Sequence, residues 1–308
     1  MKMSIFLRLR AATFAITAIV LFPIMSPAQE VSEPELQRVS YFSEATGAER
    51  DYFVYLPRGY EQGSSWPVLM FLHGNGERGD AKDELDYVLI HGAIYEAWVQ
   101  KKDLPFVIIA PQLPIYGQGE VSYIKGRSRD WIPERLPEGA HPYPGTYDGD
   151  DVMEGRPSDG ELPYGIEGPV DGWNHLADEL VGMFDHAVEN FKSDADRLYL
   201  SGLSYGGFGT WYLAGKYPDK FAAIAPVAGF GHPELAAPIA AAKLPIWNIA
   251  GGRDEVVPVQ HFYSALNELE RLGHPEVRFT IHADMGHPVW VRAYASQDLY
   301  DWLLSHRK

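Results

Sequence analysis

The 308-residue chain contains no cysteine, which excludes disulfides, thiol catalysis and lipidation at a cysteine. Basic residues are also scarce, with 26 Lys and Arg against 42 Asp and Glu, for a formal net charge of −16. Such a negative field disfavours nucleic acid and anionic membrane surfaces as partners and weakly repels polyanionic substrates. The chain has neither a phosphate-binding glycine loop nor a His/Asp/Glu cluster with zinc spacing. We therefore expect no cofactor and no metal.

Beyond the N-terminus, no stretch of the chain is apolar enough to cross a bilayer. Residues 1–28 combine a basic start, an apolar stretch at 11–24 and a small-residue end at 26–28, as secretory signal peptides do. An uncleaved anchor is the alternative, although the apolar stretch is short for one. Cleavage after Ala28 would leave a secreted or periplasmic domain, residues 29–308, of 308 − 28 = 280 residues with no membrane anchor.

Apolar runs alternate with helical patterns along the chain. Trp173 to Phe191 and Val259 to Leu272 both carry apolar residues at helical spacing, which indicates core-facing helices. Residues 31–50 are expected to form a leading strand or hairpin. Seven further strands are expected at 51–57, 67–72, 105–110, 197–203, 221–227, 245–250 and 276–282. The alternation predicts an α/β fold with a mostly parallel central sheet and helices on both faces.

The segment Gly202-Leu-Ser204-Tyr-Gly206 lies between the expected strand at 197–203 and a helical pattern at 208–216. Small residues two positions before and after Ser204 allow a sharp turn that exposes the serine hydroxyl. Ser204 is therefore the candidate nucleophile. The alternative is a glycine-rich strand-to-helix connection in which the serine is incidental.

Two possible partners of Ser204 follow in loops after later strands. Asp254 stands in Gly-Gly-Arg-Asp-Glu-Val-Val-Pro after the run 244–249, and His287 stands in Met-Gly-His-Pro after the run 277–281. A serine needs an adjacent base to become a nucleophile; an imidazole oriented by a carboxylate provides one near neutral pH. The order Ser204, Asp254, His287 predicts a catalytic triad. Taken singly, Asp254 could be a turn residue and His287 a loop histidine.

A glycine-rich loop, His73-Gly74-Asn75-Gly76, follows the buried strand expected at 67–72. Backbone N–H groups in such a loop can approach a developing oxyanion, together with the N–H of the residue after the nucleophile. We assign these donors to Asn75 and Tyr205, and we expect His73 to be structural. A flexible surface loop is the alternative for this segment.

Residues 72–79, 202–211, 254–258 and 286–290 together resemble the secreted esterase branch of the α/β-hydrolase superfamily. This branch includes phospholipase/carboxylesterase-like proteins and a "predicted peptidase" group, whose terminal helix is similar to residues 294–304. It is related to polyhydroxybutyrate depolymerases and to feruloyl and acetylxylan esterases. The resemblance covers residues 50–113 and 173–308. It implies the α/β-hydrolase fold, and the Asp-x-x-Val-Pro pattern favours Asp254 over Glu255 as the triad acid.

Residues 114–172 form a longer insertion than the resemblance implies, rich in glycine, proline, acidic residues and aromatics. Loops after strand ends gather around active sites in open α/β sheets. We expect a lid or substrate wall here, with a self-packed surface excursion as the alternative. Candidate substrate contacts are Tyr116, Trp131 and, outside the insertion, Trp290.

Acidic residues at 148–154 suggest a calcium site, because calcium prefers oxygen ligands. Their spacing does not match the twelve-residue calcium loop with its terminal glutamate, which favours a solvated acidic turn.

These features predict a serine hydrolase that cleaves carboxylic esters through an acyl-enzyme on Ser204. The expected substrate is a small-molecule or polymeric ester: short-acyl, feruloyl or acetyl-polysaccharide, or polyester. Two alternatives remain, a serine peptidase with the same triad and a non-catalytic binding protein on a hydrolase scaffold. The sequence makes no prediction of the oligomeric state.

Overall fold

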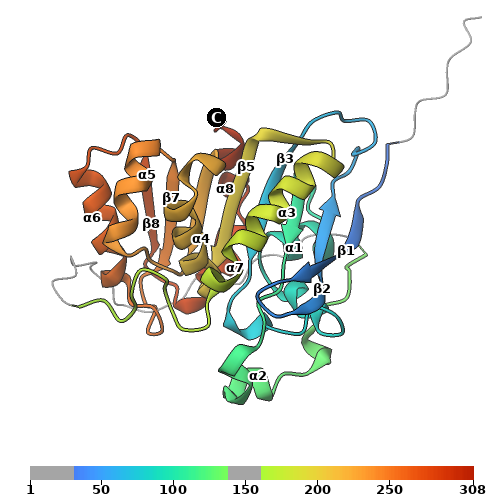
Figure 1. The fold of residues 1–308 in the computed structure, drawn as a ribbon, viewed down its shortest axis with the longest axis horizontal. Helices are drawn as coiled ribbons and strands as arrows, with labels where there is room; N and C mark the ends of the chain where they lie inside the picture. Colours follow the sequence, from blue (N-terminus) through green and yellow to red (C-terminus); the bar gives the residue numbers. More distant parts are fainter. Residues whose placement is uncertain (1–30, 138–160) are drawn as a thin grey trace, which may run out of the picture. The chain divides into compact units, whose positions relative to one another are not determined.

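A single eight-stranded sheet runs through the centre of the described residues (Figure 1). The computed structural model describes residues 31–137 and 161–308. The predicted signal peptide at 1–28 and the acidic segment at 148–154 lie outside this part. The strands are β1 Glu35–Ser43, β2 Ala48–Leu56, β3 Trp66–Leu72, β4 Val107–Ala110, β5 Ser193–Leu203, β6 Ala223–Val227, β7 Ile246–Gly251 and β8 Val277–His282.

The strand order in space is β1-β2-β4-β3-β5-β6-β7-β8. Strands β1 and β2 form an antiparallel hairpin, and β2 also pairs antiparallel with β4. All other pairs are parallel, from β4 through to β8. The mostly parallel sheet is thereby confirmed. Residues 31–50 contain β1 and the first three residues of β2, and the leading hairpin extends through the strand expected at 51–57.

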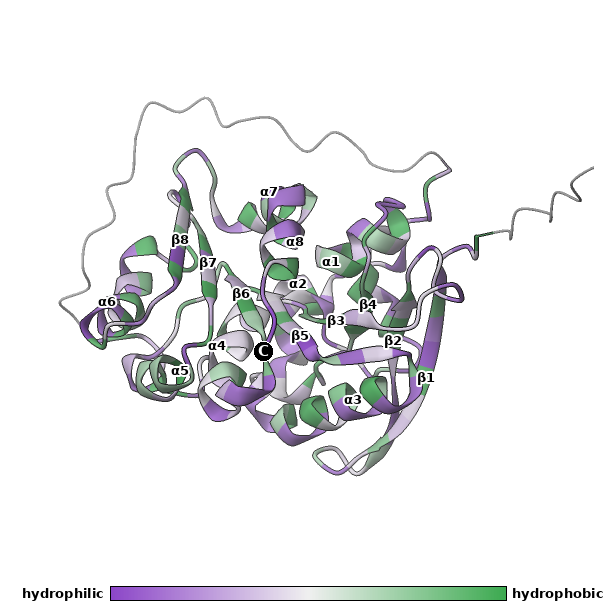
Figure 2. Cartoon of the chain, turned by 90° about the horizontal axis from the view of Figure 1, so that it is seen from above, coloured by the Kyte–Doolittle hydropathy of each residue, from purple (hydrophilic) through white to green (hydrophobic). Residues whose placement is uncertain are grey.

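Helices cover both faces of the sheet, as Figures 1 and 2 show from two directions. One face carries α3 to α6, and the other carries α1, α7 and α8. The helices are α1 Gly92–Ile94, α2 Ser122–Lys125, α3 Ala177–Asn190, α4 Tyr205–Lys216, α5 Ala236–Ala242, α6 Tyr263–Arg271, α7 Trp290–Ala295 and α8 Gln297–Leu304. Short 3₁₀ helices extend several of them, including Trp173–Leu176 before α3 and Val259–Phe262 before α6.

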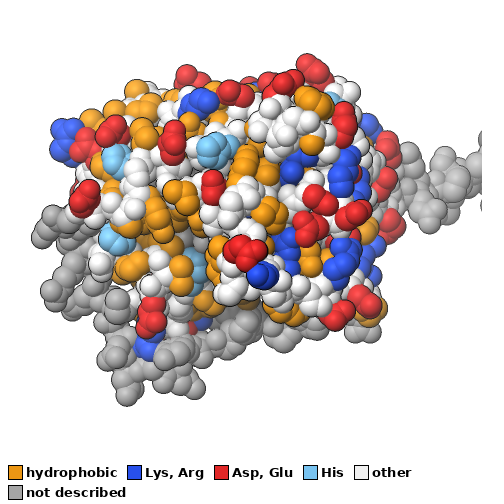
Figure 3. Space-filling view, turned by 60° about the horizontal axis from the view of Figure 1, so that its bottom comes forward, with side chains coloured by type: hydrophobic (Ala, Val, Ile, Leu, Met, Phe, Trp, Pro, Cys, Tyr) orange, Lys and Arg blue, Asp and Glu red, His pale blue; other side chains and the backbone are white. Residues whose placement is uncertain are grey.

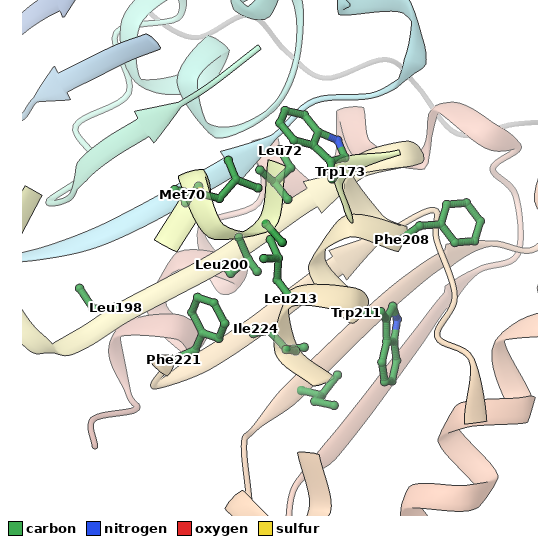
Figure 4. Packing of buried hydrophobic residues seen from close by; sticks show 14 of the residues in the cluster. Met70, Leu72, Trp173, Leu198, Leu200, Phe208, Trp211, Leu213, Phe221 and Ile224 are labelled. Atoms are coloured by element: carbon green, nitrogen blue, oxygen red, sulfur yellow. The ribbon is translucent and has the colours of Figure 1, made fainter. Parts of the chain in front are cut away.

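Alternate residues of the central strands enter two hydrophobic clusters, one on each face. In β3, Met70 and Leu72 pack under α3 and α4, while Leu69 and Phe71 face the opposite cluster. Successive strand side chains point to opposite faces, and parallel strands buried on both sides are apolar throughout. Figure 4 shows the first cluster, where Trp173 and Leu213 lie above the sheet. The buried core thus fixes the strand ends from which the loops emerge.

Several helical regions are not predicted from the sequence, among them residues 85–99, α2 and α5. Residues 85–99 form three short segments, Leu85–Ile90, α1 and the π-helical turn Tyr95–Val99. Gly92, with φ of +80°, interrupts any continuous helical period there. Helix α5 is almost all alanine and has no amphipathic stripe. In the part of the chain that the structure describes, no helix is long and apolar enough to span a membrane.

Glu96 is a buried carboxyl group in this region, only 7% exposed. Desolvation raises its pKa from 4.5 to about 7, against a smaller lowering by Lys102. The folded protein therefore keeps a proton that the unfolded chain releases between pH 4.5 and 7, so stability falls as pH rises through this window. The loss approaches about 3 kcal/mol above pH 7.

We expect Glu96→Gln to remove this dependence, because the amide cannot ionise. Urea unfolding at pH 5 and pH 7.5 measures it: the free energy of unfolding should change less between the two pH values in the variant than in the parent protein. Glu234→Gln, at an exposed position, is the matched control and should leave the dependence unchanged. Equal pH dependence in parent and Glu96→Gln would contradict the prediction.

Candidate active site

Ser204 occupies a strained turn between β5 and α4. Its φ of +51° and ψ of −115° lie where non-glycine residues are rarely found. A Cβ added to Gly202 would lie 2.4 Å from the Gly206 carbonyl oxygen, and one added to Gly206 would lie 1.9 Å from the Leu72 carbonyl oxygen. The two glycines thus let β5, α4 and the end of β3 approach closely enough to present the serine.

Ser204, His287 and Asp254 form a continuous hydrogen-bonded chain at the carboxyl ends of β5, β8 and β7. The His287 Nε2 atom is 3.0 Å from Ser204 Oγ, and His287 Nδ1 is 2.7 Å from Asp254 Oδ2. This is the distance range in which an imidazole can accept a serine proton. Ser204 lies 83 positions from His287 in the sequence, and Asp254 lies 33 positions from it. The fold therefore brings together three residues that are far apart in the chain.

The Asp254 carboxylate is buried, at 3% exposure, and both of its oxygens are occupied. Its Oδ1 atom accepts hydrogen bonds from the backbone N–H groups of Val256 at 2.9 Å and Val257 at 2.8 Å. These bonds hold Oδ2 toward the His287 ring. Glu255, the rival acid, is exposed.

The loop after β3 is built around a buried, neutral histidine. His73 Nε2 accepts a hydrogen bond from the Leu113 N–H at 2.9 Å, so Nδ1 carries the proton and donates to the Gly74 carbonyl at 2.6 Å. Desolvation lowers the pKa of His73 to about 3. Trp173 donates its indole N–H to the His73 carbonyl at 3.2 Å. His73 therefore fixes the backbone of the loop and does not line the cavity described below.

Arg78 ties this loop to three other parts of the site, a link the sequence analysis missed. Its buried guanidinium donates to the Asn75 side-chain oxygen, to the Pro114 carbonyl at 2.8 Å and to the Asp171 carbonyl at 2.7 Å. It also lies 4.9 Å from the centre of the Tyr205 ring. One side chain thus joins the two residues assigned as oxyanion donors to both ends of the insertion.

The described part of the insertion packs against the same loop. Tyr123 in α2 accepts a hydrogen bond from the Asn75 side-chain nitrogen at 2.6 Å. Arg127 donates to the carbonyl of Gly76 at 3.2 Å and to that of Arg78. Tyr123 and Arg127 therefore hold this part of the insertion against the loop after β3.

A cavity of about 320 Å³ opens beside Ser204. Trp290 is among the lining residues, whereas Tyr116 and Trp131 are not. Tyr116 packs against the core with its ring 5.3 Å from that of His175, and Trp131 is 56% exposed on a 3₁₀ turn. The lining residues are Gly74, Asn75, Gly76, Glu77, His91, Tyr123, Leu203, Ser204, Tyr205, Val256, His287 and Trp290.

The cavity lies on the side of the molecule that carries α2, at the bottom of Figure 1. Figure 3 turns this side forward and shows hydrophobic side chains and histidines in the middle of the face, with charged side chains gathered to the right. Over residues 31–137 and 161–308, no group of three or more His, Asp or Glu residues could hold a metal ion.

Three comparisons place the chain among known proteins. The prolyl oligopeptidase family model matches residues 173–237, from before α3 to the start of α5. Poly(3-hydroxyalkanoate) depolymerase C of Paucimonas lemoignei is 47% identical over 47 residues, 15% of this chain and 11% of that protein. The bifunctional acetylxylan esterase/xylanase XynS20E of Neocallimastix patriciarum is 32% identical over 81 residues, 25% of this chain and 11% of that one. The matches thus span about a tenth of each curated relative.

The crystal structure of a thermostable esterase superposes with a TM-score of 0.57 at 22% identity, covering 89% of this chain and 63% of the esterase. The chain has the α/β-hydrolase fold. The predicted fold class is confirmed by that match. In this fold the loops after β3, β5, β7 and β8 meet at one edge of the sheet, which is where open α/β sheets bind ligands.

The contact at Gly206 yields a direct test of the turn around Ser204. We expect Gly206→Ala to lower the free energy of unfolding by about 3 kcal/mol or more, because the methyl group would overlap the Leu72 carbonyl. Gly182→Ala in α3 is the matched control, since nothing lies within 4 Å of its added Cβ; it should stabilise the protein by about 0.5–1 kcal/mol. Denaturant unfolding compares the two, and equal effects would contradict the packing argument.

Arg78 yields a second test. Arg78→Lys keeps the charge, but an ammonium group lacks the planar set of N–H donors with which the guanidinium reaches three separated oxygens. We therefore expect the free energy of unfolding to fall by about 2 kcal/mol or more. Arg271→Lys, whose Arg pairs with Glu268 on the exposed face of α6, should leave the unfolding free energy almost unchanged, because surface ion pairs contribute little. Thermal unfolding of both variants measures the difference. An unchanged Arg78→Lys protein would show that the clamp adds no stability.

Proposed function

We propose that this α/β-hydrolase is a serine hydrolase that cleaves carboxylic esters through an acyl-enzyme on Ser204. The observation that carries the proposal is the hydrogen-bonded chain from Asp254 through His287 to Ser204, with distances of 2.7 and 3.0 Å, beside a 320 Å³ cavity. The relatives named for depolymerisation of a polyester and for acetylxylan cleavage support an ester substrate.

In the first half of the proposed reaction, Ser204 Oγ attacks the ester carbonyl carbon while His287 Nε2 takes the hydroxyl proton. Asp254 stabilises the imidazolium that forms. The oxyanion receives hydrogen bonds from the backbone N–H groups of Asn75 and Tyr205. Tyr205 is the first residue of α4, where N–H groups have no partner within the helix and the helix dipole favours negative charge. Each such donor contributes about 10²–10³ in rate.

The tetrahedral intermediate then collapses, and the C–O bond to the alcohol breaks. The alcohol leaves with the proton from His287. In the second half, His287 deprotonates a water molecule that attacks the acyl carbon, and the acid is released as Ser204 regains its proton. His287 accepts and returns the proton in both halves of the reaction, so the proposed cycle needs no cofactor.

The insertion serves in this proposal as a substrate wall through Tyr123, which lines the cavity and contacts Asn75. Trp290 also lines the cavity and lies next to His287, with the two rings 5.0 Å apart. We also propose that residues 1–28 direct export to the periplasm or beyond, as their composition indicates.

A serine peptidase is the second candidate, because the prolyl oligopeptidase family model matches residues 173–237. The same triad could attack an amide. Peptide substrates therefore belong in the same test as esters.

We expect Ser204→Ala to lower kcat on p-nitrophenyl acetate by a factor of about 10⁶, because the substitution removes the nucleophile. Ser305→Ala, at the end of α8, is the control and should retain parental activity. A fluorophosphonate should modify the parent protein at Ser204, with fluoride as the leaving group, and mass spectrometry would locate the adduct.

Activity that survives Ser204→Ala would assign the chemistry to another residue. Faster turnover of a peptide p-nitroanilide than of any ester would replace the esterase with the peptidase. Absence of turnover and of labelling would leave a binding protein on a hydrolase scaffold.

A further inference from the structure

Asn75 and Gly76, in the loop after β3, form the one Asn-Gly dipeptide of the sequence. An asparagine deamidates most readily before glycine, which has no Cβ to hinder the approach of its backbone nitrogen to the asparagine side chain. Both residues line the cavity beside Ser204, which gives water access to them. The proposed ester hydrolysis uses the backbone N–H of Asn75 and assigns no chemistry to its side-chain amide.

The nitrogen that would react lies at the start of a short helix. Residues Asn75–Glu77 form a 3₁₀ helix of three residues, and Gly74 before it is extended. N–H groups in the first turn of a helix have no partner within that helix. A Cβ added to Gly76 would meet nothing within 4 Å, whereas one added to Gly74 would lie 2.7 Å from the Leu203 side chain. The backbone at Gly76 is therefore held neither by the helix nor by close packing.

Two hydrogen bonds hold the side-chain amide of Asn75. Its oxygen accepts from Arg78, which fixes the orientation of the amide, and its nitrogen donates to the Tyr123 hydroxyl at 2.6 Å. Arg78 belongs to the same loop, whereas Tyr123 belongs to the insertion, 48 positions along the chain. Attack by a backbone nitrogen turns the planar amide carbon tetrahedral and moves both amide atoms, which the two bonds oppose. The insertion thereby restrains a reactive group of the loop.

We propose that Asn75 is a deamidation site, and that its hydrogen bond to Tyr123 limits the rate of the reaction. In the first step the Gly76 nitrogen attacks Asn75 Cγ and loses its proton. The bond from Cγ to the side-chain nitrogen then breaks, and ammonia leaves with that proton. Water opens the resulting cyclic imide at either carbonyl, which gives aspartate or isoaspartate at position 75.

Either product changes the loop that is proposed to bind the oxyanion. Isoaspartate places the side-chain methylene in the main chain, which lengthens the backbone between positions 75 and 76. Aspartate keeps the backbone but adds a carboxylate beside the position of the developing oxyanion, and like charges repel strongly at short range. Esterase activity is therefore expected to fall as Asn75 is modified.

Peptide mapping of the folded full chain during incubation at mildly alkaline pH tests the proposal. Deamidation replaces an NH₂ group by OH, which peptide mass detects, and isoaspartyl methyltransferase labels isoaspartate. We expect slow conversion at Asn75 and none at Asn267, an exposed residue followed by glutamate in α6. Tyr123→Phe should raise the rate at Asn75 about fivefold, which is the equivalent of one hydrogen bond of about 1 kcal/mol.

Two further variants serve as controls. Tyr263→Phe, in α6, removes a hydroxyl from a residue that does not line the cavity beside Ser204, and should leave the rate at Asn75 unchanged. Gly76→Ala should slow the reaction, because the methyl group hinders attack by the backbone nitrogen. It should do so in the Tyr123→Phe background as well, which separates reaction at this peptide bond from general unfolding of the variant.

Three results would overturn the inference. The first is an unmodified Asn75 in both the parent protein and Tyr123→Phe after the same dipeptide has converted in the urea-unfolded chain. The second is an equal rate in the parent protein and Tyr123→Phe, and the third is a fast rate that Gly76→Ala does not slow. Peptide masses do not depend on ester cleavage, so this inference and the proposed function can each fail without the other.

Discussion

The approach of the Gly206 backbone to the Leu72 carbonyl is the contact on which the rest of the site depends. It brings the start of α4 against the end of β3. The turn at Ser204 and the loop at Asn75 therefore both begin at this contact. A side chain at position 206 would separate the two. Ser204 and the Tyr205 N–H would then lose their relation to the other proposed oxyanion donor, Asn75. The positive φ of Ser204 is held by this packing and by the core beneath it.

A second layer of contacts holds the loop from outside. The His73 imidazole accepts a hydrogen bond from the Leu113 N–H and donates one to the Gly74 carbonyl. Arg78 donates to the Asn75 side chain and to the carbonyls of Pro114 and Asp171 at the ends of the insertion. Burial keeps His73 neutral, which lets one nitrogen donate while the other accepts. The His73 and Asn75 side chains therefore have defined partners, which positions the backbone N–H groups proposed to bind the oxyanion before substrate arrives. Such preorganisation is a large contributor to catalysis by hydrolases.

The sequence predicts the sheet well, because strands buried on both faces are continuous apolar runs with no competing period. It fails at residues 85–99, where an extended His91 and a positive φ at Gly92 divide the helix into short pieces. The residues of the Ser204–His287–Asp254 chain stand in loops with local turn chemistry and could be named in advance. Arg78 could not, since its partners are backbone carbonyls 36 and 93 positions away. Carbonyls carry no sequence signal. Tyr123 could not be predicted either, because nothing in the local sequence distinguishes it from Tyr116 or Trp131.

The bonds from Arg78 to Pro114 and Asp171 have a consequence for how such a protein can diversify. They join backbone oxygens only, so they are indifferent to the side chains that lie between. Arg78 therefore holds the two ends of the insertion through backbone alone, whereas Tyr123 and Arg127 contact the loop through their side chains. The side chains of the insertion can change without loss of the end contacts, but a change at Tyr123 or Arg127 also reaches the loop beside Ser204.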